Sequence, residues 1–351
     1  MLELLAYVIG FLIGIIMAVP THELGHLVCG KISGYKFLSF RLGNLLWTKE
    51  TDGKIRLVKN KLGIRGILGQ CLMIPPADEK NFKFVLYNLG GGIFNIIVSV
   101  IFIPLLFAAN SANVGMFLFG IGVGQLLLGV MNIIPNGKKS PIPNDGANIK
   151  ETLKSDDAKH AFYTMFKHNS ESMRGKFLAD YSEDDFRVSE NADVNNFMVA
   201  LLIMYSAARF EELGEFERSY NELLRLEYAD LQAFYKWQVS INLIYHELVY
   251  FGGELANKGK ARLEENRNNR PLMQRLEMEQ PNTLPFKAAK LGFIDGDIEQ
   301  ALACVERSRE NLASLKNPGL EHQLEVLCEY LRLALTRTPY TTADEFPDHT
   351  T

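Results

Sequence analysis

The chain has 351 residues, with 37 Lys and Arg side chains against 41 Asp and Glu side chains. Residues 1–150 carry a net charge of +7 and hold long uncharged apolar runs, whereas residues 151–351 carry a net charge of −11 and hold none. This division excludes a single soluble globule and a disordered chain, and it predicts a basic membrane part joined to an acidic soluble part. The acidic second part also argues against nucleic acid as a partner.

The first predicted element is a transmembrane helix over residues 4–30. Residues 4–21 contain no charged or His side chain, and the apolar character continues to about Gly30. A signal peptide starts with basic residues and ends at a small-residue cleavage site. This segment instead starts with Met-Leu-Glu and leads into Thr-His-Glu-Leu-Gly-His, so we expect a retained membrane helix.

The end of this helix carries His22-Glu23-Leu24-Gly25-His26, an H-E-x-x-H sequence. Residues four apart lie on one face of a helix, so His22 and His26 can bind one Zn²⁺ from a single rigid element. The intervening Glu23 can then act as a general base. The alternative is a set of polar residues at a helix end that face water. Ionisable groups in apolar surroundings are costly without partners, which favours the metal site.

The segment 31–80 is basic and has strand character. Residues 35–42 alternate between apolar and polar side chains, and the runs 45–48 and 55–58 flank an Asp-Gly turn, which predicts a β-hairpin within residues 35–68. The apolar, Gly-punctuated stretch 63–76 is expected at the membrane face. A hairpin that is simply solvated in the cytosol is the alternative.

Two further transmembrane helices are predicted at 84–108 and 114–136. Residues 84–137 are 54 positions without an acidic, basic or His side chain, more than one span needs, and the polar stretch 109–113 divides them. Gly120 and Gly124 give the third helix a face suited to close packing. The segment 31–80 carries ten Lys and Arg residues, so it should be cytosolic, with the N-terminus outside and everything after residue 137 cytosolic.

A zinc site of this kind needs a third protein ligand, and no other His precedes His160. The ligand must therefore be a carboxylate. Asp145 follows the third helix on a Pro-stiffened segment and on the same side of the membrane as the His pair. A plain N-cap of a helix that begins near Gly146 is the alternative role for Asp145. The other acidic candidates for the third ligand are Glu3, Glu50, Asp52, Asp78 and Glu79. Asp78 is the next choice after Asp145.

Together these features resemble the site-2 protease family of intramembrane zinc metalloproteases, over residues 1–150. The resemblance rests on H-E-L-G-H at the end of a first membrane helix and on Asn132-Ile-Ile-Pro135 followed by Asp145-Gly146. The segment 90–95, Gly-Gly-Gly-Ile-Phe-Asn, is similar to the family's A-G-P-x-x-N segment, with Gly92 in place of Pro. No PDZ-like insert, which many relatives have, is evident.

The resemblance implies one Zn²⁺ held by His22, His26 and Asp145. It implies that Glu23 is the general base on a zinc-bound water and that Asn95 positions the substrate. An interhelical hydrogen bond is the alternative role for Asn95. The resemblance also implies that the hairpin is a membrane-associated sheet that guides substrate.

Residues 151–338 are expected to form a cytosolic α-helical domain, and residues 339–351 a disordered tail. The segments 214–226 and 296–308 are similar to the second helix of a tetratricopeptide hairpin, which favours a helical-repeat-like layer. Their spacing of 82 residues is not a multiple of 34, so a regular array is not expected. The fold class expected for the chain is therefore mainly α: a three-helix transmembrane metalloprotease core with a small membrane-associated sheet, then a soluble all-α domain.

We expect an intramembrane zinc endopeptidase of a bacterial cell membrane that hydrolyses a peptide bond in or near a transmembrane segment. Its partners would be the lipid bilayer, a membrane-spanning protein or peptide substrate, and a cytosolic protein bound by the helical domain. The alternative is a catalytically silent membrane anchor whose helical domain recruits a cytosolic partner. The complete set of His22, Glu23, His26 and Asp145 favours the enzyme.

Overall fold

The structure, a computed structural model, describes residues 1–50, 53–59 and 68–336. The chain is mainly helical and forms two compact units, Met1–Ser170 and Glu171–Thr351. The helices α5 (Asp145–Thr152) and most of α6 (Asp156–Ser172) group with the first unit, whereas the domain boundary predicted from the sequence is at residue 150. The tail expected at 339–351 lies outside the described residues.

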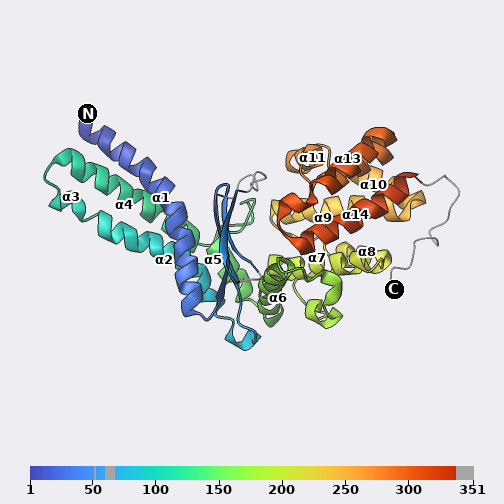
Figure 1. Cartoon of the computed structure of the whole chain (residues 1–351), viewed down its shortest axis with the longest axis horizontal. Coiled ribbons are helices and arrows are strands. Elements are labelled where there is room, and N and C mark those ends of the chain that lie inside the picture. Colours follow the sequence, from blue (N-terminus) through green and yellow to red (C-terminus); the bar gives the residue numbers. More distant parts are fainter. Residues whose placement is uncertain (51–52, 60–67, 337–351) are drawn as a thin grey trace. The chain divides into compact units, whose positions relative to one another are not determined.

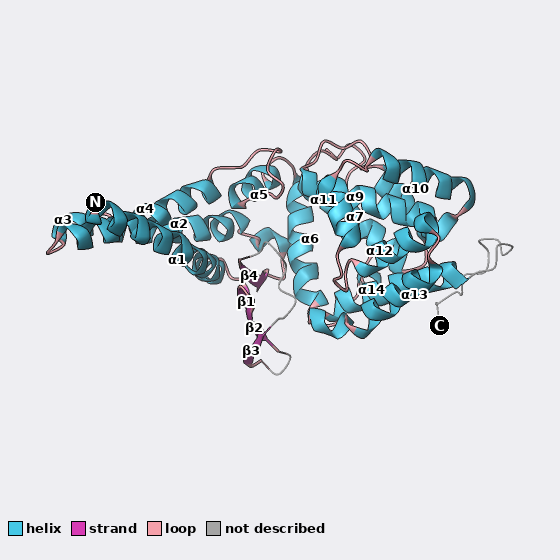
Figure 2. Ribbon diagram, turned by 90° about the horizontal axis from the view of Figure 1, so that it is seen from above, coloured by secondary structure: helices cyan, strands magenta, loops and turns pink. Residues whose placement is uncertain are grey.

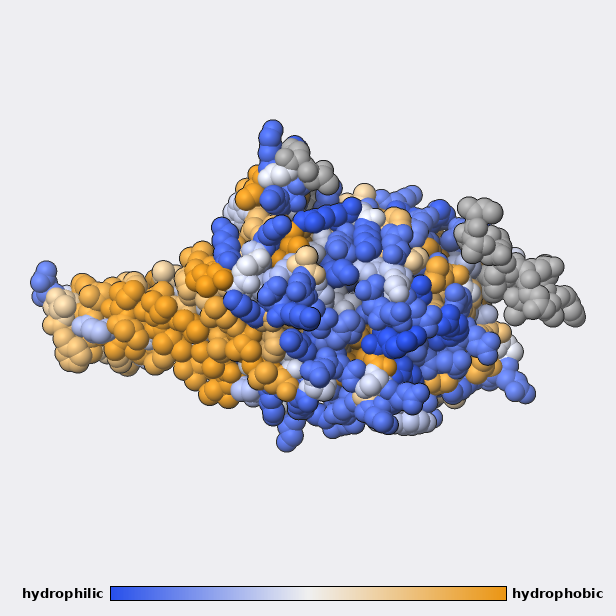
Figure 3. Space-filling view, turned by 90° about the horizontal axis from the view of Figure 1, so that it is seen from below, coloured by the Kyte–Doolittle hydropathy of each residue, from blue (hydrophilic) through white to orange (hydrophobic). Residues whose placement is uncertain are grey.

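Three long helices of the first unit pack against one another: α1 (Leu2–Ile32), α2 (Phe84–Phe102) and α4 (Ala112–Ile133) (Figure 1). A short helix, α3 (Leu105–Ala108), lies between the last two in sequence. Three helical segments are long and apolar enough to cross a membrane: Leu2–Ile32, Glu79–Ala108 and Ala112–Ile133. The face of this bundle seen in Figure 3 is almost wholly hydrophobic, as a lipid-facing surface would be.

Helix α4 ends at Ile133, three residues before the end that the sequence predicted, residue 136. Ile134 already has an extended backbone, as the residue before a proline prefers. The predicted small-residue face is confirmed: a Cβ on Gly120 would collide with the Tyr7 backbone of α1, and one on Gly124 would lie 2.8 Å from the Phe11 carbonyl oxygen. These glycines therefore allow α4 to approach α1 closely.

A four-stranded antiparallel sheet follows α1, with the strand order β3-β2-β1-β4 (Figure 2). Its strands are β1 (Lys36–Leu42), β2 (Leu45–Lys49), β3 (Ile55–Lys59) and β4 (Gly69–Ile74). The first three strands confirm the predicted hairpin, although Thr51 and Asp52 of its turn lie outside the described residues. The fourth is a correction, because residues 69–74, expected only as an apolar membrane-face segment, pair with β1 from Leu42↔Gly69 to Lys36↔Ile74.

Aromatic side chains hold α6 and the N-terminal end of α2 together within the first unit. Phe162 and Phe166 of α6 pack edge-on against Phe82, and Phe166 also packs against Tyr87. A short 3₁₀ helix, η1 (Glu79–Asn81), precedes α2 and is capped by the Asp78 side chain, which accepts a hydrogen bond from the Lys80 backbone.

The second unit consists of helices packed around a large apolar core. Its helices, in chain order, are η2 (Leu178–Asp180), η3 (Glu183–Phe186), α7 (Phe197–Glu212), α8 (Phe216–Leu224), α9 (Ala233–Tyr245), η4 (His246–Phe251), α10 (Gly253–Glu265), α11 (Arg270–Glu277), α12 (Leu284–Lys290), η5 (Leu291–Asp295), α13 (Ile298–Glu310), η6 (Leu312–Leu315) and α14 (Pro318–Thr336).

The two segments expected to form second helices of hairpins do so. Helix α8 packs on α7, and α13 packs on α12. Each follows a glycine with positive φ, Gly214 at 73° and Gly296 at 76°, a conformation that favours glycine at a sharp turn.

Candidate metal centre

Three side chains from two separate segments converge at the end of the α1–α2–α4 bundle. The Nε2 atoms of His22 and His26 are 3.0 Å apart. The Oδ2 atom of Asp145 is 3.0 Å from the first of these nitrogens and 3.4 Å from the second. The structure thus brings together three of the residues that the sequence singled out as metal ligands.

The spacing of these atoms suits a tetrahedral ion. Zinc binds imidazole nitrogen and carboxylate oxygen at about 2.0–2.2 Å, so two ligands at a tetrahedral angle lie about 3.3 Å apart. Asp145 Oδ2 and His22 Nδ1 are buried and have no partner in hydrogen-bonding geometry among the described residues, although Oδ2 lies close to both imidazoles. Burial alone would raise the pKa of Asp145, but the neighbouring imidazoles hold it well below its usual range. The donor set therefore fits a zinc ion.

The backbone of α2 fixes the orientation of His26. Its Nδ1 lies 2.8 Å from the Tyr87 carbonyl oxygen. Because a carbonyl can only accept, this nitrogen must carry the proton, which leaves the lone pair on Nε2 directed at the cluster. A backbone carbonyl in this role is common among metal-binding histidines, because it fixes both the tautomer and the ring orientation.

Glycines allow the two helices to meet at the site. A Cβ on Gly25 would collide with the backbone of Gly90, and one on Gly91 would collide with the His22 imidazole. The third glycine of the run, Gly92, faces Ile133 of α4. The run of glycines at 90–92 therefore lets α2 approach both α1 and α4, and it leaves the His22 ring no room to turn toward α2.

Asn144 holds Asp145 in place, and the alternative N-cap role for Asp145 is wrong. The N-cap of α5 is Asn144, whose Oδ1 accepts from the Ala147 backbone, while Asp145 is the first residue of the helix. The Nδ2 atom of Asn144 donates to the carbonyls of Met131 and Ile134 at 2.7 and 2.8 Å. Asn144 thus ties the start of α5 to the end of α4. Nothing in our sequence analysis pointed to it.

Glu23 lies beside the three ligands and beneath the strand β4. It is 8% exposed and lies within electrostatic reach of both imidazoles and of Asp145. The Cys71 backbone hydrogen-bonds to its carboxylate. A Cβ on Gly69 would lie 2.7 Å from Glu23 Oε1 and 2.8 Å from a Val19 methyl. The strand that our sequence analysis missed therefore covers the proposed base.

Asn95 is buried among the membrane helices, and both polar atoms of its side chain lack a hydrogen bond among the described residues. The alternative interhelical bond for Asn95 is thus not made there. Asn95 lies one helical turn beyond Gly91, on the same face of α2. Gln125 of α4 is also fully buried with both polar atoms unpaired among these residues. It is a second candidate that our sequence analysis did not identify.

The other acidic candidates for the third ligand have different roles. Asp78 caps η1, and Glu79 is 3.1 Å from His160. Glu50 pairs with Arg56 at 3.1 Å, Glu3 lies in the first turn of α1, and Asp52 is outside the described residues. None of the described four belongs to the cluster of His22, His26 and Asp145.

No family model, curated protein or solved structure matches this chain.

Proposed function

We propose that the first unit is an intramembrane zinc endopeptidase that resembles the site-2 proteases. The proposal rests on one observation: His22, His26 and Asp145 converge, with Glu23 beside them, at one end of an apolar three-helix bundle. Ionisable groups placed at the end of such a bundle are costly unless they have a function. The substrate would be a peptide bond in or near a transmembrane segment.

A zinc ion held by His22, His26 and Asp145 would supply the Lewis acidity that activates water and polarises the scissile carbonyl. Glu23 would accept the proton of the attacking water and return it to the leaving amine. The hydrogen bond from the Cys71 backbone orients the Glu23 carboxylate for this work, and Gly69 leaves the carboxylate the space that it occupies.

The position of β4 suggests how a substrate would be held. Among the described strands, β4 is an edge strand, paired only with β1. A helical substrate must unwind before its backbone can be attacked, which exposes unpaired N–H and C=O groups. Adding the unwound segment to the free edge of β4 would pair these groups next to Glu23. Asn95 and Gln125 offer further unpaired donors and acceptors for substrate.

The basic residues suggest the orientation. Segment 31–80 and residues Lys138 and Lys139 would lie in the cytosol, with the N-terminus outside. The metal centre lies toward the C-terminal end of α1 and the N-terminal end of α2, which is the cytosolic end in this orientation. Water would reach the site from that side.

The test is the Glu23→Gln variant of the full chain, co-expressed with single-span membrane peptides. Glu23 is not a ligand, so the purified variant should keep its zinc but lose cleavage. The matched control is Glu3→Gln, which changes the other acidic residue of the same helix and should leave both unchanged. Substantial turnover by Glu23→Gln would refute the assignment of the base. A wild-type protein that binds zinc but cleaves nothing would favour the silent scaffold.

The second unit would then regulate the protease or recruit a cytosolic partner, because every candidate for catalysis lies in the first. A truncation that removes residues 173–351 separates these roles while keeping α6, whose aromatic side chains pack against Phe82 and Tyr87. Poor cleavage with normal zinc content is expected for recruitment, and increased cleavage for gating. Unchanged cleavage of every substrate would contradict both roles.

A further inference from the structure

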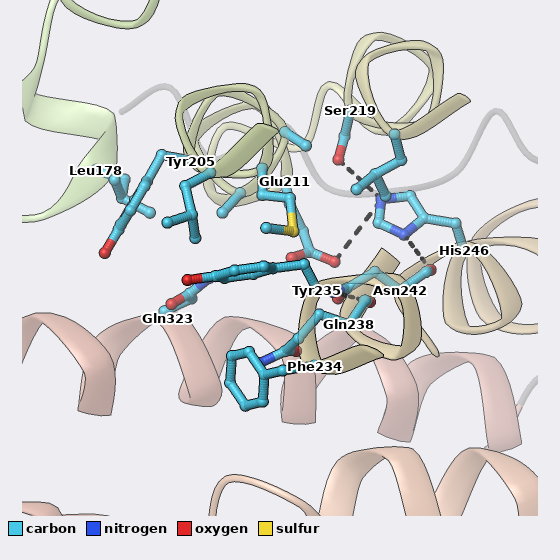
Figure 4. A pocket seen from close by; sticks show the side chains of 15 residues that line it. Leu178, Tyr205, Glu211, Ser219, Phe234, Tyr235, Gln238, Asn242, His246 and Gln323 are labelled. Atoms are coloured by element: carbon cyan, nitrogen blue, oxygen red, sulfur yellow. Dashed lines mark hydrogen bonds and ion pairs between the residues drawn. The ribbon is translucent and has the colours of Figure 1, made fainter. Parts of the chain in front are cut away.

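The second unit contains a pocket of about 210 Å³ between α7, α8 and α9, and Leu178 and Gln323 of α14 also line it (Figure 4). Its walls are mostly apolar and aromatic, with Leu201, Met204, Phe234 and Tyr235 among them. Pockets for drug-sized ligands measure roughly 300–1,000 Å³. This pocket is smaller, so it suits a small molecule or the end of a longer one.

One carboxylate faces this pocket. Glu211 is 4% exposed, and its Oε1 accepts a 2.6 Å hydrogen bond from the Tyr250 hydroxyl. The approach of His246 Nε2, at 3.9 Å, is also to Oε1, so both of these contacts fall on the same carboxylate oxygen. Glu211 also lies in the last turn of α7, where the helix dipole favours a positive charge. A buried carboxylate in a pocket without a cation is costly, and a cationic ligand would offset that cost.

His246 does not neutralise Glu211. Its Nδ1 lies 2.9 Å from the Asn242 carbonyl oxygen and must therefore donate, which leaves Nε2 as an acceptor for the Ser219 hydroxyl at 2.8 Å. Burial lowers the pKa of His246 to about 4, so the ring is neutral at physiological pH. No Lys or Arg is among the described residues that line the pocket, so no protein cation there pairs with Glu211.

A second acceptor lies nearby. The Nδ2 atom of Asn242 donates to the Gln238 backbone carbonyl at 2.8 Å, which leaves the amide oxygen of Asn242 as an acceptor. The rings of Phe234 and Tyr235 add the negative faces that attract cations. The pocket therefore combines hydrogen-bond acceptors, aromatic faces and apolar walls without a competing positive charge.

We propose that this pocket binds a primary ammonium group carried on a small apolar body, with Glu211 as its counter-ion. The ammonium donates to Glu211 Oε2 and to the Asn242 amide oxygen, and the apolar body lies against Phe234 and Tyr235. This site does not depend on the protease assignment, because all of its residues belong to the second unit.

The same chemistry occurs in free amines and at peptide N-termini, and the probes separate the two. The full-length protein in detergent is titrated with phenethylamine and with the tripeptide Phe-Ala-Ala amide. Their counterparts without an ammonium group are 2-phenylethanol and the N-acetylated tripeptide. We expect the amines to bind at least tenfold more tightly than these counterparts. Binding of phenethylamine alone identifies a free-amine site, and tighter binding of the tripeptide identifies a peptide N-terminus.

The decisive variant is Glu211→Gln, and its matched control is Glu212→Gln. Glu212 is the next residue and is also largely buried, but its carboxylate accepts from the Ala179 backbone and does not line the pocket. Glu211→Gln should weaken phenethylamine binding at least tenfold, and Glu212→Gln should not. Ala208→Leu fills the pocket without changing its charge and should also abolish binding. It is a second test of the pocket for the case in which Glu211→Gln does not fold.

The pH dependence gives a further test. Burial raises the pKa of Glu211 to about 7, so the anionic form that pairs with an ammonium is gained as the pH rises. Affinity for phenethylamine should rise about tenfold between pH 6 and pH 8. The other titratable groups that face Glu211 are His246, Glu212, Tyr245, Tyr250 and Tyr330.

Three results would overturn the proposal. They are the absence of binding by either amine at millimolar concentration, equal binding of phenethylamine and 2-phenylethanol, and unchanged binding by Glu211→Gln.

Discussion

The three proposed metal ligands are held by different local contacts. The helix α1 sets the spacing of His22 and His26, the Tyr87 carbonyl fixes the His26 ring, and Asn144 holds Asp145 at the start of α5. Partners of this kind orient metal ligands, and their loss typically weakens metal affinity by about 10–100-fold. Asn144 is therefore as much a part of the candidate site as the three proposed ligands.

The first prediction concerns Asp145. Asp145→Asn removes the charged ligand and should lower zinc affinity by more than about 100-fold, which exceeds the usual effect of a supporting residue. Competition with a chelator of known affinity measures this change in the purified protein. The control is Asp78→Asn, which changes only the cap of η1. Equal loss of zinc in both variants would remove Asp145 from the site.

The second prediction concerns the stability of the second unit. Burial raises the pKa of Glu211 from 4.5 to about 7, and that of Glu212 likewise, and it lowers the pKa of His246 from 6.5 to about 4. For each glutamate the unfolded state loses its proton first, so stability falls as the pH rises from 4.5 through 7. For His246 stability is lost as the pH falls from 6.5 through 4.

These contributions oppose each other between pH 4.5 and 6.5, and above pH 6.5 only the glutamates act. Stability should therefore fall by about 1 kcal/mol per glutamate between pH 6.5 and pH 8. Urea unfolding followed by Trp237 fluorescence, in a Trp47→Phe background, measures the change. Glu211→Gln should reduce the slope of stability against pH by about half. A urea midpoint of unfolding that rises between pH 6.5 and pH 8 would contradict the assignment of these pKa shifts.

At the scale of the elements, β4 has an unusual position. It is the edge strand of the sheet, and it also lies against the membrane helix that carries the proposed base. The Tyr87 hydroxyl donates to the Cys71 carbonyl at 2.7 Å, and the Tyr87 carbonyl contacts His26. Tyr87 of α2 therefore links the strand to a proposed metal ligand, so the position of the strand and the geometry of the candidate site depend on each other.

The third prediction tests this coupling. Gly69→Val places a branched side chain where Glu23 and Val19 now lie. The displaced carboxylate should lower the cleavage rate by about 100-fold, since a misplacement near 1 Å commonly has that effect, while zinc content stays normal. The control is Gly137→Ala, because a Cβ at Gly137 meets no atom within 4 Å. Cleavage at the wild-type rate in Gly69→Val would show that β4 does not position Glu23.

The membrane-length helices and the convergence of His22, His26 and Asp145 were predictable because their signals are local. Apolar length, the i,i+4 spacing and a Pro-stiffened loop are all read directly from neighbouring residues. Strand β4 was not predictable, because Gln70-Cys71-Leu72-Met73 shows no alternation and its pairing with β1 is distant in sequence. The pocket around Glu211 was not predictable either, since it forms only when several helices pack.

At the scale of the whole molecule, the fourth prediction concerns topology. With three spans and a cytosolic segment 31–80, the C-terminus should lie in the cytosol. A reporter that is active only in the cytosol, fused after Thr351, should therefore be active. Its counterpart, active only outside, should be silent at the same position and active when fused before Met1. The reverse pattern would overturn the orientation inferred from the basic residues.

The length of α1 also makes the lipid itself a determinant of the proposed activity. About 28 Å of helix separates Glu3 from His22, at 1.5 Å per residue, and a typical hydrocarbon layer is about 30 Å thick. With Glu3 held at the outer surface, α1 places the proposed centre close to the inner boundary. Longer acyl chains would submerge the centre in hydrocarbon and hinder access of water, unless the helix became more upright. Cleavage in vesicles should therefore slow as acyl chains lengthen, which makes membrane thickness a physical control on this protein.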